Sequence, residues 1–366
     1  MFRREGKVVC IVSAASDGAT VCYARTGKDK PHVLYAKRAL LPLEDRSDEQ
    51  IRVAIVNTID TLLKDTANRF APDSIHVVVH EPWSRFGTAS GSVVFEKERS
   101  ITKALIDEVA RSALEKIQEK DAEAGVVRVF LNGYPTERPL GKRAHSLETI
   151  VFGGSVLQLF RTAAEHSIGS YFPGRRVHFH TGARVVLTVA HERMPQLNRF
   201  VVLSIRGMSE CMVIRHETET QYGTSKEGVG TILKHVAPHG LPEETLSLFR
   251  MAESDFCSTD TCNAMKDVVA RAEPELVRSF GDMFAALAST RRLPNDMLLF
   301  APAELMPWLS HFFTRIDFSQ FTTTTQPFSI QTMHQADIDG LASFEAGIVG
   351  DAMIATTAAA VNMFEE

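Results

Sequence analysis

Hydrophobic positions in the first eighty residues alternate with short polar turns, and they predict an antiparallel meander, then a helix, then a buried strand. The helix begins where Ser47 and Gln50 form a capping-box pattern, and its apolar residues recur at helical spacing. The predicted strands are Val8–Val12, Thr20–Arg25, Val33–Ala39 and Ile75–Val79. The last of these is a β-branched run typical of a parallel strand, so the segment is predicted to be a sheet covered by a helix.

The pattern changes after Glu81, where Pro82, Gly87 and Gly91 interrupt it, and we place a domain boundary there. Residues 82–171 are predicted to form an inserted α+β module. Its predicted elements are a strand at Ser92–Glu96, a helix at Thr102–Lys120, strands at Val126–Leu131 and Leu147–Phe152, and a helix at Val156–Glu165.

The opening pattern recurs in residues 172–366, which are predicted to complete the core that residues 1–81 begin. The predicted strands are Arg176–His180, Phe200–Ile205, Glu210–His216, Thr218–Tyr222, Met297–Phe300 and Phe328–Met333. The predicted helices are Arg184–Glu192, Gly228–Ala237, Glu243–Ala252, Asn263–Leu287, Glu304–Phe313 and Asp351–Met363. No linker-like segment separates these elements, so the two halves are expected to pack on each other around a cleft.

Composition indicates a globular protein with more than one core, since 44% of the 366 residues are hydrophobic and 23% are charged. The formal net charge of -5, with both signs interspersed, argues against a nucleic-acid partner. The five cysteines are an odd number scattered along the chain, which favours a reducing compartment. Neither a secretory signal nor a membrane span is evident, so we expect a cytoplasmic protein without direct membrane insertion.

Three stretches carry a resemblance to a known family. The first, GSVVFEKERSITKALIDEVARSALEKI, is a Gly-containing strand followed by Ile101 and Thr102 at the start of a helix; VVRVFLNGYPTE and SLETIVFGGSVLQLFRTAAE follow it. With the repeated meander, they resemble the actin-like ATPase superfamily, and within it the group of the division protein FtsA and the pilus-assembly protein PilM. The resemblance implies a duplicated, ribonuclease H-like α/β fold with an α+β module inserted after the first sheet unit.

The nucleotide motifs of that superfamily are altered in this chain. Active members have Asp-x-Gly in the first turn, because glycine lets backbone N–H groups approach phosphate and the carboxylate organises Mg²⁺. Here the stretch is VSAASDGATV, in which Ser13 replaces the acid, Ala15 replaces the glycine, and Asp17-Gly18 lies further into the turn. The phosphate and Mg²⁺ binding of active members is therefore not expected at this turn.

The other two nucleotide motifs are altered as well. The second phosphate loop, Asp-Ile-Gly-Gly-Gly-Thr in the family, reads SIRGMS here, and the adenosine turn has become Ala301-Pro302-Ala303, in which proline offers no backbone donor. Phosphoryl transfer depends on positioning and charge neutralisation, so we predict weak or no ATP and Mg²⁺ binding, and no catalytic residues. The residual nucleotide cleft is predicted to contain Ser13, Ser16, Asp17, Gly18, Arg206, Gly207, Ser209, Gly223, Lys226 and Glu304.

Other features allow two interpretations each. The pairs His76/His80 and His178/His180 share strand faces, but without acids or cysteines at ligand spacing we expect packing histidines and no metal site. For the run from Gly223 to Lys226, a structural turn is the preferred interpretation and a phosphate contact is the alternative. Trp83 and Phe86 are interpreted equally as exposed anchors for a partner peptide or as core at the module boundary.

The resemblance implies a cytoplasmic, actin-like scaffold of a pilus or secretion assembly apparatus. It would bind the cytoplasmic segment of an inner-membrane protein in a groove that involves the inserted module, and would reach the membrane only through that partner. Self-association is a further expectation from the family. The alternatives are a filament-forming division ATPase of the FtsA type and a divergent kinase of the same superfamily, because fold alone does not decide function.

Overall fold

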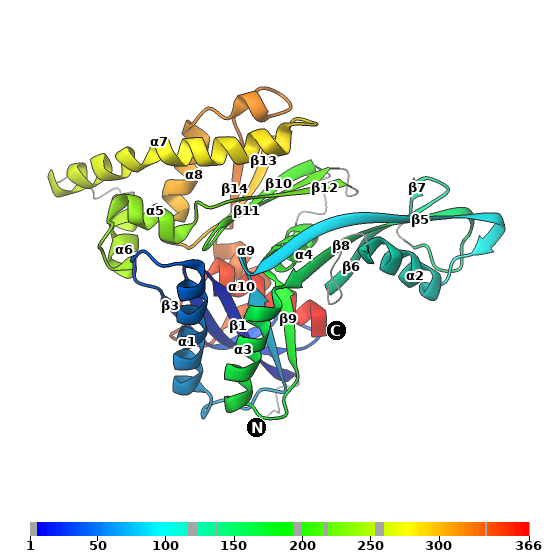
Figure 1. The fold of residues 1–366 in the computed structure, drawn as a ribbon, viewed down its shortest axis with the longest axis horizontal. Coiled ribbons are helices and arrows are strands. Elements are labelled where there is room, and N and C mark those ends of the chain that lie inside the picture. The colour runs from blue at the N-terminus through cyan, green and yellow to red at the C-terminus, as the bar shows by residue number, and fades with distance from the viewer. Residues whose placement is uncertain are drawn as a thin grey trace.

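A computed structural model describes residues 6–115, 123–136, 138–193, 199–215, 219–252, 260–333 and 335–365. The chain forms two lobes, each built on a mixed sheet, and a third sheet that projects from them (Figure 1). In both lobes three antiparallel strands are followed by a strand parallel to the first, which is the duplicated pattern that the sequence predicts.

The first lobe holds a six-stranded sheet in the order β15-β3-β2-β1-β4-β9. Its strands are β1 (Lys7–Ala15), β2 (Gly18–Thr26), β3 (His32–Leu40), β4 (Ser74–Val79), β9 (Val177–Thr181) and β15 (Ser343–Phe344). Alternate residues of β1 contribute to separate hydrophobic clusters on the two faces of the sheet, as strand geometry requires. One face packs against α1 (Asp48–Thr66) and α3 (Gln158–Tyr171), and the other against α9 (Gln335–Leu341) and α10 (Ala352–Glu365).

Helix α1 begins where the capping-box pattern predicts. The Ser47 side chain accepts a hydrogen bond from Gln50 N at 3.4 Å, and Ser47 N donates to Gln50 Oε1 at 2.9 Å. These bonds satisfy two backbone donors that a helix start would otherwise leave unpaired. The buried face of α1, which includes Ile55, Ile59 and Leu63, then covers the sheet.

The second lobe holds a five-stranded sheet in the order β12-β11-β10-β13-β14. Its strands are β10 (Arg199–Ile205), β11 (Ser209–Arg215), β12 (Glu219–Ser225), β13 (Asp296–Phe300) and β14 (Ser329–Thr332). Its helices are α5 (Val229–Val236), α6 (Pro242–Ala252), α7 (Asp260–Ala288) and α8 (Met306–Arg315), with a 3-10 turn at Ser319–Phe321. Fully buried phenylalanines such as Phe284 and Phe313 join α7 and α8 in one core, so these helices cover one face of the sheet. Helix α4 (Gly182–Arg193) packs on the other face.

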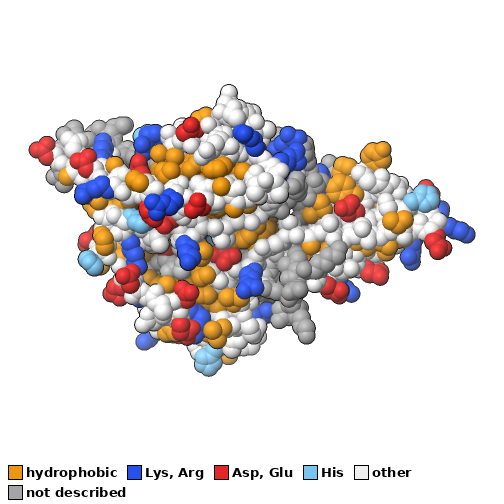
Figure 2. Space-filling model, turned by 45° about the horizontal axis from the view of Figure 1, so that its top comes forward, with side chains coloured by type: hydrophobic (Ala, Val, Ile, Leu, Met, Phe, Trp, Pro, Cys, Tyr) orange, Lys and Arg blue, Asp and Glu red, His pale blue; other side chains and the backbone are white. Residues whose placement is uncertain are grey.

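The projecting module is a four-stranded sheet with one helix (Figure 1). It consists of β5 (Ser84–Ser100), α2 (Lys103–Leu114), β6 (Glu123–Leu131), β7 (Tyr134–Pro135) and β8 (Arg143–Val156). Strand β5 is longer than the predicted strand at Ser92–Glu96, and it lies at an edge of the sheet in the order β5-β8-β6-β7. A small core of its own, including Ile106, Val109 and Leu147, holds α2 on the sheet. Figure 2 shows the module extending away from the body of the molecule.

The structure departs from the predicted boundaries at one helix. Helix α3, which the prediction 82–171 placed in the module, packs against the first-lobe sheet through Phe160, Ala164 and Ile168. The predicted remainder 172–366 contributes to both lobes, because β9 pairs with β4 of the first lobe and α10 covers the first-lobe sheet. The short elements β7, α9 and β15 are absent from the prediction. Residues 116–120 and 216–218, which include ends of three predicted elements, lie outside the described residues.

Among the helices of the described residues, none combines the length and the apolar character needed to cross a bilayer.

Candidate functional site

Two turns meet at the mouth of the cleft between the lobes. One is the Ser16-Asp17 turn between β1 and β2, and the other is the turn between β10 and β11 that contains Gly207. A Cβ atom added at Gly207 would overlap the backbone nitrogen and the Oγ atom of Ser16. A Cβ atom added at Gly228, just before α5, would in turn overlap the carbonyl oxygen of Gly207. The glycines therefore serve close backbone packing, which leaves no space for a phosphate group between Ser16 and Gly207.

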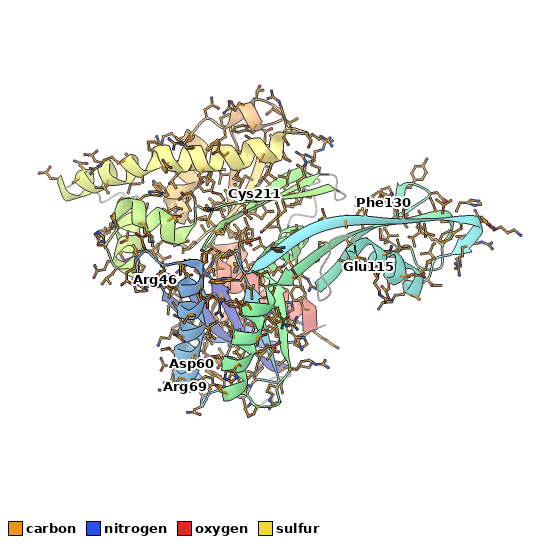
Figure 3. All side chains as sticks on the ribbon, viewed as in Figure 1. Arg46, Asp60, Arg69, Glu115, Phe130 and Cys211 are labelled. Atoms are coloured by element: carbon orange, nitrogen blue, oxygen red, sulfur yellow. The ribbon has the colours of Figure 1, made fainter. Side chains whose placement is uncertain are left out.

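Asp17 and Gly18 lie beside this contact but do not form a phosphate cradle. A Cβ atom at Gly18 would overlap the carbonyl oxygen of Ala39, so this glycine allows β2 and β3 to approach each other. Asp17 is buried, and its carbonyl oxygen accepts a hydrogen bond from Leu41 N at 2.8 Å. Its Oδ1 atom has no hydrogen-bond partner among the described residues. Asp17 lines a small hollow together with residues of α5. Arg46, which Figure 3 labels, also lines this hollow.

Three of the predicted cleft residues, Ser13, Arg206 and Glu304, line one cavity of about 230 Å³ between the lobes. The guanidinium of Arg38 donates to Glu304 Oε1 at 2.7 Å and so joins the lobes across its edge. Burial alone would raise the pKa of Glu304, but the hydrogen bond and charge of Arg38 hold it below its ordinary value. The remaining wall is largely apolar and is completed by the segment that leads into α10.

A buried polar network crosses from the first lobe to the second behind this cavity. Ser13 Oγ and His80 Nε2 lie 3.5 Å apart, and His80 Nδ1 and Glu210 Oε2 lie 3.3 Å apart. The hydroxyl of Tyr222 donates to Glu81 Oε1 at 3.1 Å and to Glu210 Oε1 at 3.3 Å. Each of these groups would be costly to bury alone, so together they fix the two lobes in one arrangement.

The buried network shifts the pKa values of Glu81 and Tyr222. Burial, followed by the charge of Glu210, raises the pKa of Glu81 to about 7. Burial and the two neighbouring carboxylates raise the pKa of Tyr222 well above its ordinary value, so its hydroxyl stays a donor. Sequence reasoning expected His80 to be a packing histidine rather than a metal ligand, and it missed Glu81, Glu210 and Tyr222. Their one signal in the sequence was Glu210 next to the apolar run 211–214 of β11.

The other predicted cleft residues have structural roles or lie apart from the cavity. The Ser209 hydroxyl donates to the carbonyl of Glu227 at 2.5 Å, and a Cβ atom at Gly223 would press on Leu287 at 3.1 Å. Lys226 is exposed and does not line the cavity. The structural interpretation of the turn at 223–226 therefore fits the geometry better than a phosphate contact.

Trp83 and Phe86 differ in accessibility. Trp83 is only 5% exposed and stacks on Phe160 with ring centroids 4.9 Å apart, so the exposed-anchor interpretation is wrong for this residue. Phe86 is half-buried against Phe152 and Tyr222. Both aromatics thus join the module to the lobes.

The histidines of β4 and β9 form a stack in which His76 Nδ1 and His180 Nε2 lie 3.0 Å apart and His178 packs on His76 at 5.1 Å between centroids. Burial and the neighbouring His180 lower the pKa of His76 to about 4. Glu365 of α10 lies 3.1 Å from His76 Nε2. The described residues contain no group of three or more ligands arranged for a metal ion.

The two meander-based lobes, their crossing helices and the central cleft define the actin-like ATPase fold. No family model matches the sequence, and no curated protein matches it. Among solved structures, the chain is similar to a chain of the PilM-PilN type IV pilus biogenesis complex, with a TM-score of 0.58 at 10% identity over 96% of this chain and 97% of that chain.

Two further solved structures are similar at lower scores. One is a Bacteroides thetaiotaomicron protein with an actin-like ATPase fold and unknown function, at a TM-score of 0.44 and 7% identity over 93% of this chain and 98% of that one. The other is the ethanolamine utilization protein EutJ from Carboxydothermus hydrogenoformans, at a TM-score of 0.44 and 10% identity over 99% of this chain and 91% of that one.

Proposed function

We propose that this protein is an actin-fold scaffold of a pilus or secretion assembly apparatus that binds a cytoplasmic segment of an inner-membrane protein at its projecting module. In this proposal it is a cytoplasmic protein held at the membrane through that partner, and its nucleotide cleft is degenerate. The similarity to a chain from the PilM-PilN complex supports a protein partner. The observation that carries the proposal is the free edge of β5 beside a large groove on the module.

The outer part of β5 is suited to pairing with an extended peptide. It is an edge strand, and its register with β8 is interrupted between Val94 and Arg99. An edge strand presents backbone N–H and C=O groups that a further strand can bind. The inner end of β5 packs near β12 and α4, so the outer half is the accessible part.

A groove of about 800 Å³ runs between this outer half and α2. Its wall combines apolar groups, including Val94 and Leu105, with the charged residues Glu96, Lys97 and Glu108. Val94 is 80% exposed, which is unusual for a valine on a strand. Backbone pairing along β5 would give affinity, and the mixed wall would select the side chains of the bound segment.

The closed turns at the cleft mouth support the degenerate-cleft part of the proposal. Ser16 and Gly207 contact each other where the family resemblance places the phosphates, and the adenosine turn has a proline. Neither turn supplies a free glycine backbone for an anion.

Val94→Glu tests the partner site, with Val53→Glu on the exposed face of α1 as the matched control. A new charge in the groove would have to be buried against the bound segment, so V94E is expected to release at least tenfold more of the protein from the membrane fraction of its native host than wild type does. V53E is expected to stay bound. Retention of V94E, or equal release of both variants, would contradict the proposal.

A further inference from the structure

The interlobe cavity is lined by a buried arginine that has no direct partner among the described residues. Arg206 is 5% exposed and lines this cavity, yet its side chain has neither a hydrogen bond nor an ion pair with any other part of the chain that the structure describes. Its Nε atom is fully buried and unpaired. A buried guanidinium loses its water and is strongly destabilising unless an anion or an acceptor replaces it. Arg206 therefore points to a missing ligand.

The other charged groups of the cavity wall have partners, although Glu304 Oε2 has no hydrogen-bond partner among the described residues. Arg38 is paired with Glu304 at 2.7 Å. Asp351 Oδ1 accepts hydrogen bonds from Met353 N at 2.9 Å and Ile354 N at 3.0 Å at the start of α10. The four charges of the wall sum to zero, but among the described residues Arg206 has neither a hydrogen bond nor an ion pair for its side chain. A ligand with one negative charge would pair with Arg206 and leave one negative charge in excess in the cavity, whereas a phosphate dianion would leave two.

The size and surface of the cavity limit how large and how polar the rest of the ligand can be. Its volume of about 230 Å³ corresponds to roughly nine non-hydrogen atoms, in proportion to the 150 Å³ cavity that holds benzene. A nucleoside triphosphate is several times larger. Ile11 and Ile354 supply apolar wall, and Ser13 and Thr20, opposite each other on β1 and β2, line the cavity as well.

We propose that this cavity binds a small monocarboxylate with a compact apolar body, and that Arg206 pairs with its carboxylate. A planar guanidinium binds a carboxylate through two parallel hydrogen bonds, which suits an arginine whose donors are unpaired. The ligand would bridge β1 and β2 of the first lobe and Arg206 of the second, so it would strengthen the closed arrangement of the lobes.

Isothermal titration calorimetry with benzoate tests the site, since benzoate joins one carboxylate to an apolar ring. Wild type is expected to bind benzoate and not the neutral benzamide. Arg206→Met is expected to weaken benzoate binding at least tenfold. Arg278→Met, which removes an exposed charge on α7, is the matched control and is expected to bind as wild type does.

Ile354→Trp provides a second test that keeps the charge of Arg206 and fills the cavity. I354W is expected to lose benzoate binding, and circular dichroism is expected to show that it remains folded. If R206M does not fold, I354W therefore tests whether benzoate binds in this cavity. Unchanged binding by R206M or I354W, equal binding of benzamide, or no benzoate binding to wild type at millimolar concentrations would overturn the proposal. Competition of benzoate by Mg-ATP that depends on Arg206 would assign the cavity to nucleotide and would overturn it as well.

Discussion

At the residue scale, Gly207 brings the backbones of the two lobes into close contact. A side chain there would overlap the backbone of Ser16, and the backbone cannot move aside as a flexible side chain can. Gly207→Ala is therefore expected to lower the free energy of unfolding by about 1–3 kcal/mol, the usual cost of overpacking. Urea denaturation measures this change.

Gly230→Ala is the control for Gly207→Ala. Nothing lies within 4 Å of a Cβ atom at Gly230, which belongs to α5. Alanine is the better helix former, so this variant is expected to gain up to about 1 kcal/mol. Equal effects of the two substitutions would mean that the turns do not touch in solution.

Glu81 makes stability depend on pH. Its pKa is raised to about 7 in the folded protein, whereas an unfolded glutamate titrates near pH 4.3. Between these values the folded state holds a proton that the unfolded state has lost, so stability falls as pH rises from about 4.5 to 7. One pKa unit corresponds to about 1.4 kcal/mol, and partial solvation of Glu81 reduces the total to about 1–2 kcal/mol.

Glu81→Gln is expected to abolish that decline, because glutamine does not titrate. Thermal or urea unfolding between pH 5 and 8 measures it, with Glu96→Gln on the exposed part of β5 as the control. The prediction fails if E81Q and wild type lose stability in parallel over this range.

At the scale of elements, Trp83 joins the module to the first lobe. Its ring stacks on Phe160 of α3, and its carbonyl accepts a hydrogen bond from Leu157 N at 2.8 Å, so both crossing points of the module meet there. Trp83→Ala is expected to cost about 3–5 kcal/mol, since it leaves a large cavity in a fully packed core.

The matched control for Trp83→Ala is Tyr134→Ala, which removes a 75% exposed aromatic from β7. It is expected to change stability by less than about 0.5 kcal/mol. Chemical denaturation monitored by far-ultraviolet circular dichroism compares the two. A small effect of W83A would contradict the placement of this side chain in the core.

At the scale of the whole molecule, several bonds tie the lobes together across the cleft. Arg38 pairs with Glu304, Lys234 Nζ lies 3.1 Å from Asp45 Oδ1, and His80 contacts Glu210. A nucleotide between the turns would have to separate Ser16 from Gly207 and compete with these bonds.

Mg-ATP is therefore expected to leave the thermal midpoint of the protein unchanged. A ligand that binds only the folded state stabilises it by about 2.7 kcal/mol at a hundred times its dissociation constant, which a thermal-shift assay detects easily. A clear upward shift together with phosphate release would favour the division-ATPase or kinase alternatives.

The sequence by itself determined most elements. Apolar periodicity and caps act over a few residues, so the meanders and the start of α1 at Ser47 could be read directly. The relative placement of the elements could not be read from the sequence. The tertiary structure decided that α3 belongs to the first lobe and that Trp83 is buried. It also decided that His80 contacts Glu210 and that Arg206 lines a cavity with no partner in the described part of the chain. These facts depend on contacts between residues far apart in the chain, and local patterns do not encode which distant surfaces meet.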